Sequence, residues 1–277
     1  MKVVLLSALV GAAHSLQLSG MGRTVTTQSS VTMSLARLDR RAALSSAASV
    51  AALTTLPHVA HADGGKPKVV VFGGSGYVGA YATQMLVAKG ADVIAVSRKS
   101  PAEQADKVKS ILGSIPKVTY MQLDASTGDL SGVLSGATAV ISCVGIAPGG
   151  ANMRDGNGAV NAKIADAAKA AGVEKYVYLG LASELANSPI KFIFGDYVKG
   201  KAEAEAAVAK DFGAGALVIK PGIIAGGPPG EVRPPGPPGM TPVSVEAVAR
   251  AAVAGALGQK VGSIDGNAAI DTLAGAL

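Results

Sequence analysis

From residue 68 onward, the chain alternates between short apolar runs and longer segments with helical spacing. The apolar runs are rich in β-branched residues and have no polar face, which is typical of strands buried on both sides of a sheet. The predicted strands are 68–72, 92–97, 118–123, 139–144, 174–179 and 216–220. The predicted helices are 77–89, 101–112, 161–171, 197–210 and 243–257, with a short one over 129–134. This alternation predicts an α/β fold with a doubly wound parallel sheet in three α/β/α layers.

Length and composition limit the number of domains. The chain has 277 residues, of which 49% are hydrophobic, enough for one buried core plus an appendage. We expect a single domain over 63–277 with a small C-terminal lobe on the substrate side. Residues 226–242 are dense in Pro and Gly, with too little chain after them for a second domain. This segment is therefore predicted to be a long loop, either functional or mobile.

The first 62 residues have the composition of a cleaved targeting leader. An apolar run over 3–10 is followed by an acid-free segment rich in Ser and Thr over 19–38. Arg40 and Arg41 then precede a weakly apolar stretch that ends in Ala-His-Ala at 60–62. A signal peptide, a transit peptide and a twin-arginine signal in series would direct a protein to a plastid, and on to the thylakoid lumen, through the secretory route. The alternative is a single mitochondrial presequence. We predict no transmembrane helix in the mature chain.

Charge and the rarest side chains exclude several classes of function. The net charge is +6, but 1–62 holds five basic residues against one acid, and 63–277 holds 20 against 18. A near-neutral body with few aromatic residues argues against a nucleic-acid partner. All three histidines lie in the leader and the chain has one Cys. The mature chain therefore has no Ser-His-Asp or Cys-His catalysis and no histidine-ligated metal, and we predict no metal site.

A glycine-rich turn connects the first strand to the first helix. Its spacing, G-x-x-G-x-x-G, suits a dinucleotide pyrophosphate. Gly73 permits the tight turn, Gly76 lets the backbone approach the phosphates, and Gly79 lets the helix pack closely. The helix N-terminus would supply amide donors. We expect the whole turn to bind the cofactor: Gly73, Gly74, Ser75, Gly76, Tyr77, Val78 and Gly79.

Residues after the next strands predict which dinucleotide binds. The second strand ends in Ser97, Arg98 and Lys99, without the acid that an NAD site usually offers to the ribose. A guanidinium favours a 2′-phosphate, so NADP(H) is preferred over NAD(H). Alternatively, the two cations only solvate a loop. Asp124, after the third strand, is placed to accept from the adenine amino group.

Small residues end the fourth strand. Cys143, Val144 and Gly145 would let the chain pass beneath the nicotinamide ribose. No neighbouring residue in the sequence would stabilise a thiolate at Cys143. We therefore assign Cys143 to packing rather than to chemistry.

Tyr197 and Lys201 form a Y-x-x-x-K motif at the start of a predicted helix. The spacing places the phenol and the ammonium on one helix face. An adjacent ammonium favours the phenolate and should lower the pKa of Tyr197. Such a pair can move a proton to or from a substrate oxygen during hydride transfer.

Taken together, residues 68–257 resemble a short-chain dehydrogenase/reductase of the atypical branch, which has a Rossmann fold. Within it they are similar to a group that includes an accessory subunit of respiratory complex I, a coenzyme Q biosynthesis factor and plastid homologues. The matching segments are 69–79, 93–98, 139–145, 160–179, 197–205, 219–224 and 241–257. The resemblance implies that Tyr197 is the acid/base, that Lys201 bonds the nicotinamide ribose, and that Pro221 to Ile223 line the nicotinamide.

The chain departs from the family just beyond the fifth strand. Active members place Ser or Thr there to bond the substrate carbonyl. Here Leu181 occupies that position and Ser183 follows two residues later. Ser183 is a catalytic candidate only if the loop bulges, because otherwise a carbonyl polariser is absent.

Two functional hypotheses follow. The first is an NADP(H)-dependent oxidoreductase acting on a small apolar carbonyl, quinone or isoprenoid-like substrate. The second is a nucleotide-binding but catalytically silent structural or assembly factor of a plastid or mitochondrial membrane complex. Apolar residues at 190 and 192–194 favour a greasy ligand, with packing of that loop on the core as the alternative.

Overall fold

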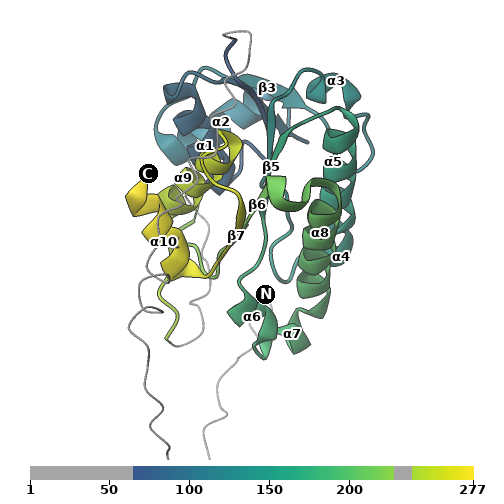
Figure 1. Ribbon diagram of the computed structural model, residues 1–277, viewed down its shortest axis with the longest axis vertical. Coiled ribbons are helices and arrows are strands. Elements are labelled where there is room, and N and C mark those ends of the chain that lie inside the picture. Colours follow the sequence, from purple (N-terminus) through teal and green to yellow (C-terminus); the bar gives the residue numbers. More distant parts are fainter. Residues whose placement is uncertain (1–64, 228–238) are drawn as a thin grey trace, which may run out of the picture. The chain divides into compact units, whose positions relative to one another are not determined.

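The computed structural model describes residues 65–227 and 239–277. Seven strands form one sheet in the order β3-β2-β1-β4-β5-β6-β7, and every neighbouring pair is parallel. The strands are β1 (Lys68–Phe72), β2 (Asp92–Ser97), β3 (Thr119–Gln122), β4 (Ala139–Ser142), β5 (Lys175–Leu179), β6 (Ala216–Lys220) and β7 (Gly262–Asp265). The predicted doubly wound parallel sheet is confirmed, with helices on both sides (Figure 1).

The helices alternate with the strands. They are α1 (Tyr77–Ala88), α2 (Pro101–Leu112), α3 (Ser131–Leu134), α4 (Met153–Asn157), α5 (Ala159–Ala170), α6 (Ser183–Asn187), α7 (Ile190–Ile193), α8 (Gly195–Phe212), α9 (Val245–Ala256) and α10 (Asn267–Ala276), with a 3-10 turn, η1, at Gly213–Gly215. No helix in the described part of the chain is long and apolar enough to span a membrane.

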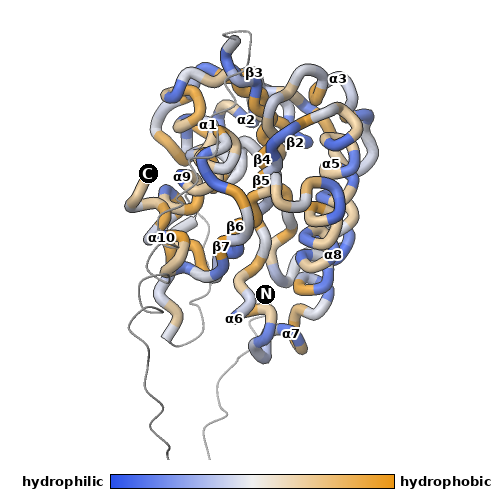
Figure 2. The backbone as a smooth tube through the Cα atoms, in the orientation of Figure 1, coloured by the Kyte–Doolittle hydropathy of each residue, from blue (hydrophilic) through white to orange (hydrophobic). Residues whose placement is uncertain are grey.

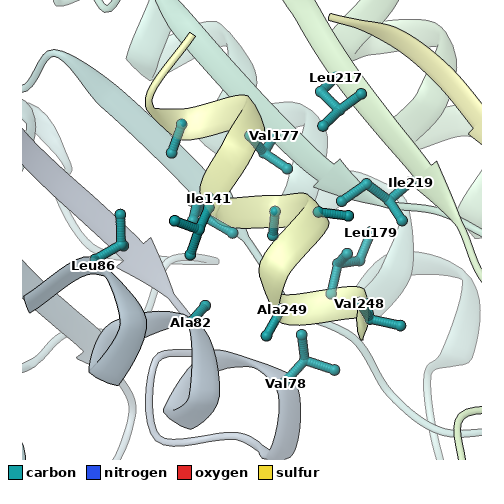
Figure 3. Packing of buried hydrophobic residues seen from close by; sticks show 14 of the residues in the cluster. Val78, Ala82, Leu86, Ile141, Val177, Leu179, Leu217, Ile219, Val248 and Ala249 are labelled. Carbon is teal, nitrogen blue, oxygen red and sulfur yellow. The ribbon is translucent and has the colours of Figure 1, made fainter. Parts of the chain in front are cut away.

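Each strand sends alternate side chains to two separate cores. In β1, Val69 and Val71 face the core formed with α1, α9 and α10, while Val70 and Phe72 face the core formed with α3, α5 and α8. Figure 3 shows the first core, where α9 packs on β4, β5 and β6. The hydropathy colouring in Figure 2 is correspondingly orange along the central strands. The three predicted layers are therefore present.

The C-terminal region contains elements that the sequence pattern does not predict. Residues 262–265 form β7, which extends the sheet beside β6, and α10 packs on α9. Only Ile264 of β7 is buried, so the strand lacks a two-sided apolar run. The short helices α4, α6 and α7 also went unpredicted, because one or two turns are too short for periodicity to show.

Two predictions lie outside the described residues. The targeting leader over 1–62 is one of them. The other is most of the Pro- and Gly-rich loop, of which 226–227 and 239–242 are described.

Candidate functional site

The glycine-rich turn joins β1 to α1 with the geometry that its spacing predicts. Gly73 has a φ of +77°, a conformation that glycine adopts without a steric penalty. Its amide donates to Val96 O of β2 at 2.8 Å, and its carbonyl accepts from Gly76 N at 2.8 Å. The turn is thus fastened to the neighbouring strand, and the N-terminus of α1 opens beside it.

Gly79 packs directly on this turn. A Cβ at Gly79 would lie 2.2 Å from Gly73 O and 2.8 Å from Gly74 Cα. A Cβ at Gly74 would lie 2.7 Å from Ala95 Cβ of β2. A side chain at either position would push the turn off the sheet, so both glycines are sterically required.

Tyr77 connects the turn to the segment that follows β6. Its hydroxyl donates to Ala225 O at 3.3 Å, and its ring packs edge-on against Tyr81, with centroids 6.0 Å apart. Ser75 and Val78, the other two residues of the turn that are not glycine, are buried. Residues 225–226 therefore run close to the start of α1.

At the end of β2 the two cations differ. Lys99 Nζ lies 3.1 Å from Glu103 Oε1, and Glu103 also forms a capping box with Ser100. These bonds, to Ser100 first and then Lys99, lower the pKa of Glu103 to about 2. Arg98 forms no salt bridge with any residue in the described ranges. Of these two cations, Arg98 is the one without a salt bridge to the described residues.

Ser97 and Asp124 lie beside these cations and stabilise their own turns. Ser97 Oγ accepts from Lys99 N at 3.1 Å. Asp124 Oδ1 accepts from Ser126 N at 2.8 Å and from Ser126 Oγ at 2.6 Å. Hydrogen bonds from Ser126 are the main cause of the lowered pKa of Asp124, and Arg98 lowers it further. One carboxylate oxygen of Asp124 is therefore engaged by its own turn.

The end of β4 borders the glycine-rich turn. A Cβ at Gly73 would lie 3.0 Å from Cys143 O and 3.3 Å from Val144 N. Burial raises the pKa of Cys143 to about 12, so this side chain stays a thiol at neutral pH. Gly145 follows, and a Cβ there would lie 3.5 Å from Lys201 Nζ. The structure thus brings the glycine turn, Cys143, Gly145 and Lys201 together.

Lys201 is a buried cation near the carboxyl ends of β4 and β5. Its side chain rises from α8, and Nζ donates to Leu179 O, at the end of β5, at 2.8 Å. Nζ also lies 5.9 Å from the ring centroid of Tyr197 and 5.4 Å from that of Tyr178. Burial lowers the pKa of Lys201 to about 8.

Tyr197 lies one helical turn before Lys201 and is half-buried. Burial raises the pKa of its phenol above the usual value. The expectation that this pKa is lowered is therefore wrong. Desolvation is the cause of the raised pKa, and the Lys201 ammonium, 5.9 Å from the ring centroid, donates to the Leu179 carbonyl rather than to the phenol oxygen.

Two buried asparagines, which the sequence analysis missed, shape the loop after β4. Asn157 exchanges hydrogen bonds with both the amide and the carbonyl of Ile146, at 3.3 and 2.9 Å. Asn161 donates to Val144 O at 3.2 Å and accepts from Ser142 Oγ at 2.5 Å. The two asparagines are four residues apart, a spacing that places both side chains on one helix face. This spacing is the sequence signal that could have identified them.

Ser183 bonds Asp265 rather than either residue of the Tyr197 and Lys201 pair. Its amide donates to Asp265 Oδ1 at 2.9 Å, and its hydroxyl donates to Asp265 Oδ2. Asp265 ends β7, on the far side of β6, and also pairs with Lys220 at 3.4 Å. The one hydrogen of the Ser183 hydroxyl is thus donated to the Asp265 carboxylate.

Pro221 and Ile223 follow β6, and Asn267, which the sequence does not mark as a candidate, bonds the backbone of Gly222 and Ile223. Asn267, at the start of α10, accepts from Gly222 N at 2.8 Å. It also donates to Ile223 O at 3.1 Å and Thr241 O at 2.7 Å. Three distant backbone groups converge on one carboxamide.

A cavity of about 280 Å³ lies beside this carboxamide. Its lining comprises Ala182, Glu184, Gly222, Gly239, Met240, Thr241, Asp265, Gly266, Asn267, Ala268 and Ala269. Neither Tyr197 nor Lys201 is in the lining. Within the described ranges, no cluster of His, Cys, Asp and Glu is suited to hold a metal ion.

Comparisons with known proteins agree with this geometry. A family model described as NAD(P)H-binding matches residues 73–259. An uncharacterized chloroplastic protein of Arabidopsis thaliana is 32% identical over 165 residues, which are 60% of this chain. The chain spans 53% of the length of that relative.

Solved structures share the fold at low sequence identity. The Bordetella bronchiseptica enzyme WbmH, in complex with NAD+, has a TM-score of 0.58 at 19% identity, over 76% of this chain and 81% of its own. UDP-glucuronic acid 4-epimerase from Bacillus cereus, in complex with UDP-glucuronic acid and NAD, has a TM-score of 0.54 at 16% identity, over 72% and 77%. At such identity these likenesses establish the fold alone.

Proposed function

This chain belongs to the NAD(P)H-binding family, with the Rossmann-like fold of an atypical short-chain dehydrogenase/reductase, and from that premise we propose that it is an NADP(H)-dependent oxidoreductase. Its substrate is a small apolar carbonyl, quinone or isoprenoid-like molecule. One observation carries the proposal. Lys201 is buried, with Nζ bonded to Leu179 O at the end of β5 and 3.5 Å from the Cβ position of Gly145, next to the glycine-rich turn, and the half-buried Tyr197 lies one helical turn before it.

The residues of the turn fit a dinucleotide. Three features favour this fit: an uncapped N-terminus at α1, a glycine conformation at Gly73, and no room for a Cβ at Gly79. The N-terminal amides of α1 would donate to the pyrophosphate. Bound NADPH supplies a hydride to the substrate carbon, and this chain supplies the proton.

Tyr197 is the proton donor in this proposal. Its raised pKa keeps the phenol protonated at neutral pH, so it can protonate the substrate oxygen as the hydride arrives. The Lys201 ammonium, fixed by Leu179 O, would stabilise the phenolate that remains. Reduction is the direction that this protonation state favours.

Arg98 is the basis for preferring NADP(H). Lys99 is engaged by Glu103, whereas Arg98 is free of salt bridges to the described residues. Its planar guanidinium can donate two parallel bonds to a phosphate. We propose that Arg98 binds the 2′-phosphate.

A second candidate function is a nucleotide-binding structural or assembly factor. The hydrogen bond of Ser183 favours it, because the hydroxyl donates to Asp265 and its one hydrogen is then not offered to a substrate carbonyl. In this role, bound NADP(H) would stabilise the fold by mass action. For either function we propose a plastid location, which the leader composition and the chloroplastic relative support.

The deciding experiment compares the wild type with Tyr197→Phe. NADPH and NADH are titrated by nicotinamide fluorescence, and NADPH oxidation is measured with quinones and with aldehydes. The oxidoreductase proposal predicts unchanged NADPH binding and loss of turnover in Tyr197→Phe. Tyr120→Phe is the matched control, since the Tyr120 hydroxyl on β3 is buried without a hydrogen-bond partner in the described part of the chain. Tight binding with no turnover in any variant would favour the structural function.

A further inference from the structure

Two adjacent apolar side chains on α7 are almost fully exposed. Phe192 is 82% exposed and Ile193 is 72% exposed. The other large hydrophobic residues exposed in the described ranges, Ile115, Val261 and Leu277, are single and between 37% and 50% exposed. The alternative interpretation, that this loop packs on the core, is therefore wrong for Phe192 and Ile193.

The fold holds this pair at an end of the domain. In Figure 1, α6 and α7 lie at the lower end of α8, outside the layers that cover the sheet. The Nζ of Lys191 lies 5.3 Å from the centroid of the Phe192 ring, so an ammonium accompanies the aromatic side chain. Tyr197 follows four residues after Ile193. The protruding pair is thus next to the proposed reaction site along the chain.

We propose that α7 is a membrane-contact element whose Phe192 and Ile193 side chains insert into the interfacial region of a lipid bilayer. Lys191 would remain at the level of the headgroups, with its ammonium near lipid phosphates. Long cationic side chains and adjacent aromatic rings adopt this arrangement at membrane interfaces. The purpose of the contact rests on the proposed function, because an apolar quinone or isoprenoid substrate is dissolved in the membrane.

A lipid surface fits these observations better than a protein partner. A specific protein interface buries about 800 Å² on each side over some 20 residues, with an apolar centre. Here the exposed apolar surface is concentrated in two side chains on a four-residue helix. Such a small protrusion can enter a bilayer, where each buried apolar group contributes independently of shape complementarity. The cation at Lys191 also matches an anionic headgroup.

A single tryptophan can report insertion at this helix. The chain contains no Trp, so Phe192→Trp in the full-length chain reports from α7 alone, whatever the leader does. Vesicles of phosphatidylcholine, with and without phosphatidylglycerol, are added to the variant. Insertion predicts a shift of the emission to shorter wavelength, and quenching by lipids brominated on the acyl chain. Ile115→Trp, in the loop after α2, is the matched control and should show neither effect.

Two second-site changes test the chemistry. Adding Ile193→Ser to Phe192→Trp should lower partitioning into vesicles by roughly tenfold, because an apolar side chain is lost from the interface. Adding Lys191→Glu should weaken binding to phosphatidylglycerol vesicles and leave binding to pure phosphatidylcholine nearly unchanged. Thermal stabilisation by NADPH, measured in each variant, shows that the fold and the nucleotide site are intact.

Three results would overturn the inference. One is no spectral change in the Phe192→Trp variant with either vesicle while NADPH still stabilises the protein. Another is an equal change in the Ile115→Trp control, which would indicate general adsorption. The last is a change that follows protein concentration without vesicles, which would assign α7 to contact between copies. Insertion in a protein that oxidises no NADPH would uphold this inference and refute the oxidoreductase proposal.

Discussion

The substitution Gly79→Ala tests the packing of α1 on the glycine-rich turn. A Cβ at this position would lie 2.2 Å from Gly73 O and 2.8 Å from Gly74 Cα. Both neighbours are backbone atoms, which cannot rotate away as a side chain can. The turn must therefore move by about 0.8 Å to bring the carbonyl to a tolerable 3.0 Å.

This displacement has two measurable costs. Overpacking against a fixed backbone destabilises a protein by about 1–3 kcal/mol, which lowers the melting temperature of a domain of this size by roughly 2–12 °C. The same movement shifts the Gly73 carbonyl and the first amides of α1, where the pyrophosphate would bind. We expect the NADPH dissociation constant to rise by roughly tenfold or more.

The assay is thermal unfolding with and without NADPH, together with fluorescence titration of NADPH. Gly132→Ala is the matched control, because Gly132 lies in α3 and its Cβ would meet nothing within 4 Å. Alanine there should be neutral or should stabilise by up to about 1 kcal/mol. If Gly79→Ala melts with the wild type and binds NADPH equally well, the steric argument for the turn is refuted.

Three further predictions concern single side chains. Arg98→Ala should weaken NADPH binding by roughly tenfold or more and leave NADH binding unchanged, whereas Lys99→Ala should do much less, and calorimetric titration of both nucleotides checks this. Burial lowers the pKa of Lys201 to about 8 from 10.5, so the unfolded chain holds more protons between these values. Wild-type stability should therefore rise from pH 8 towards 10.5 relative to Lys201→Met, as urea unfolding across that range can show. Ser183→Ala should cost about 1 kcal/mol, through its bond to Asp265, and leave NADPH turnover unchanged; loss of turnover would place the hydroxyl in the reaction site.

The fold could be predicted because its central strands need no partner to be recognised. β1, for example, has Val69 and Val71 facing one core and Val70 and Phe72 facing the other, so the whole run is apolar. β7 could not be predicted, because at the sheet edge only Ile264 is buried. Its identity as a strand comes from pairing with β6, a contact that the local sequence does not record.

In the candidate site, too, the residues with local constraints could be predicted and those with distant partners could not. Gly73 and Gly79 could be identified because the constraints on a turn act within a few residues. The partner of Ser183 could not, because Asp265 lies 82 residues further along the chain. Asn267 likewise bonds backbone groups 26 to 45 residues away, so its importance depends on the assembled sheet.

The pKa values of the pair on α8 show why spacing alone misjudges chemistry. The i, i+4 spacing of Tyr197 and Lys201 correctly places the two side chains as neighbours, and it suggests a stabilised phenolate. Burial acts on both groups, however, and it disfavours the charged form of each. At neutral pH the pair is therefore a neutral phenol beside an ammonium that loses its proton more easily than an exposed lysine does. A phenol can give a proton but cannot take one, so this state is prepared for reduction. Oxidation of an alcohol would first require the phenolate form of Tyr197. The phenolate fraction grows as the pH rises, so we expect alcohol oxidation, rather than carbonyl reduction, to accelerate with pH.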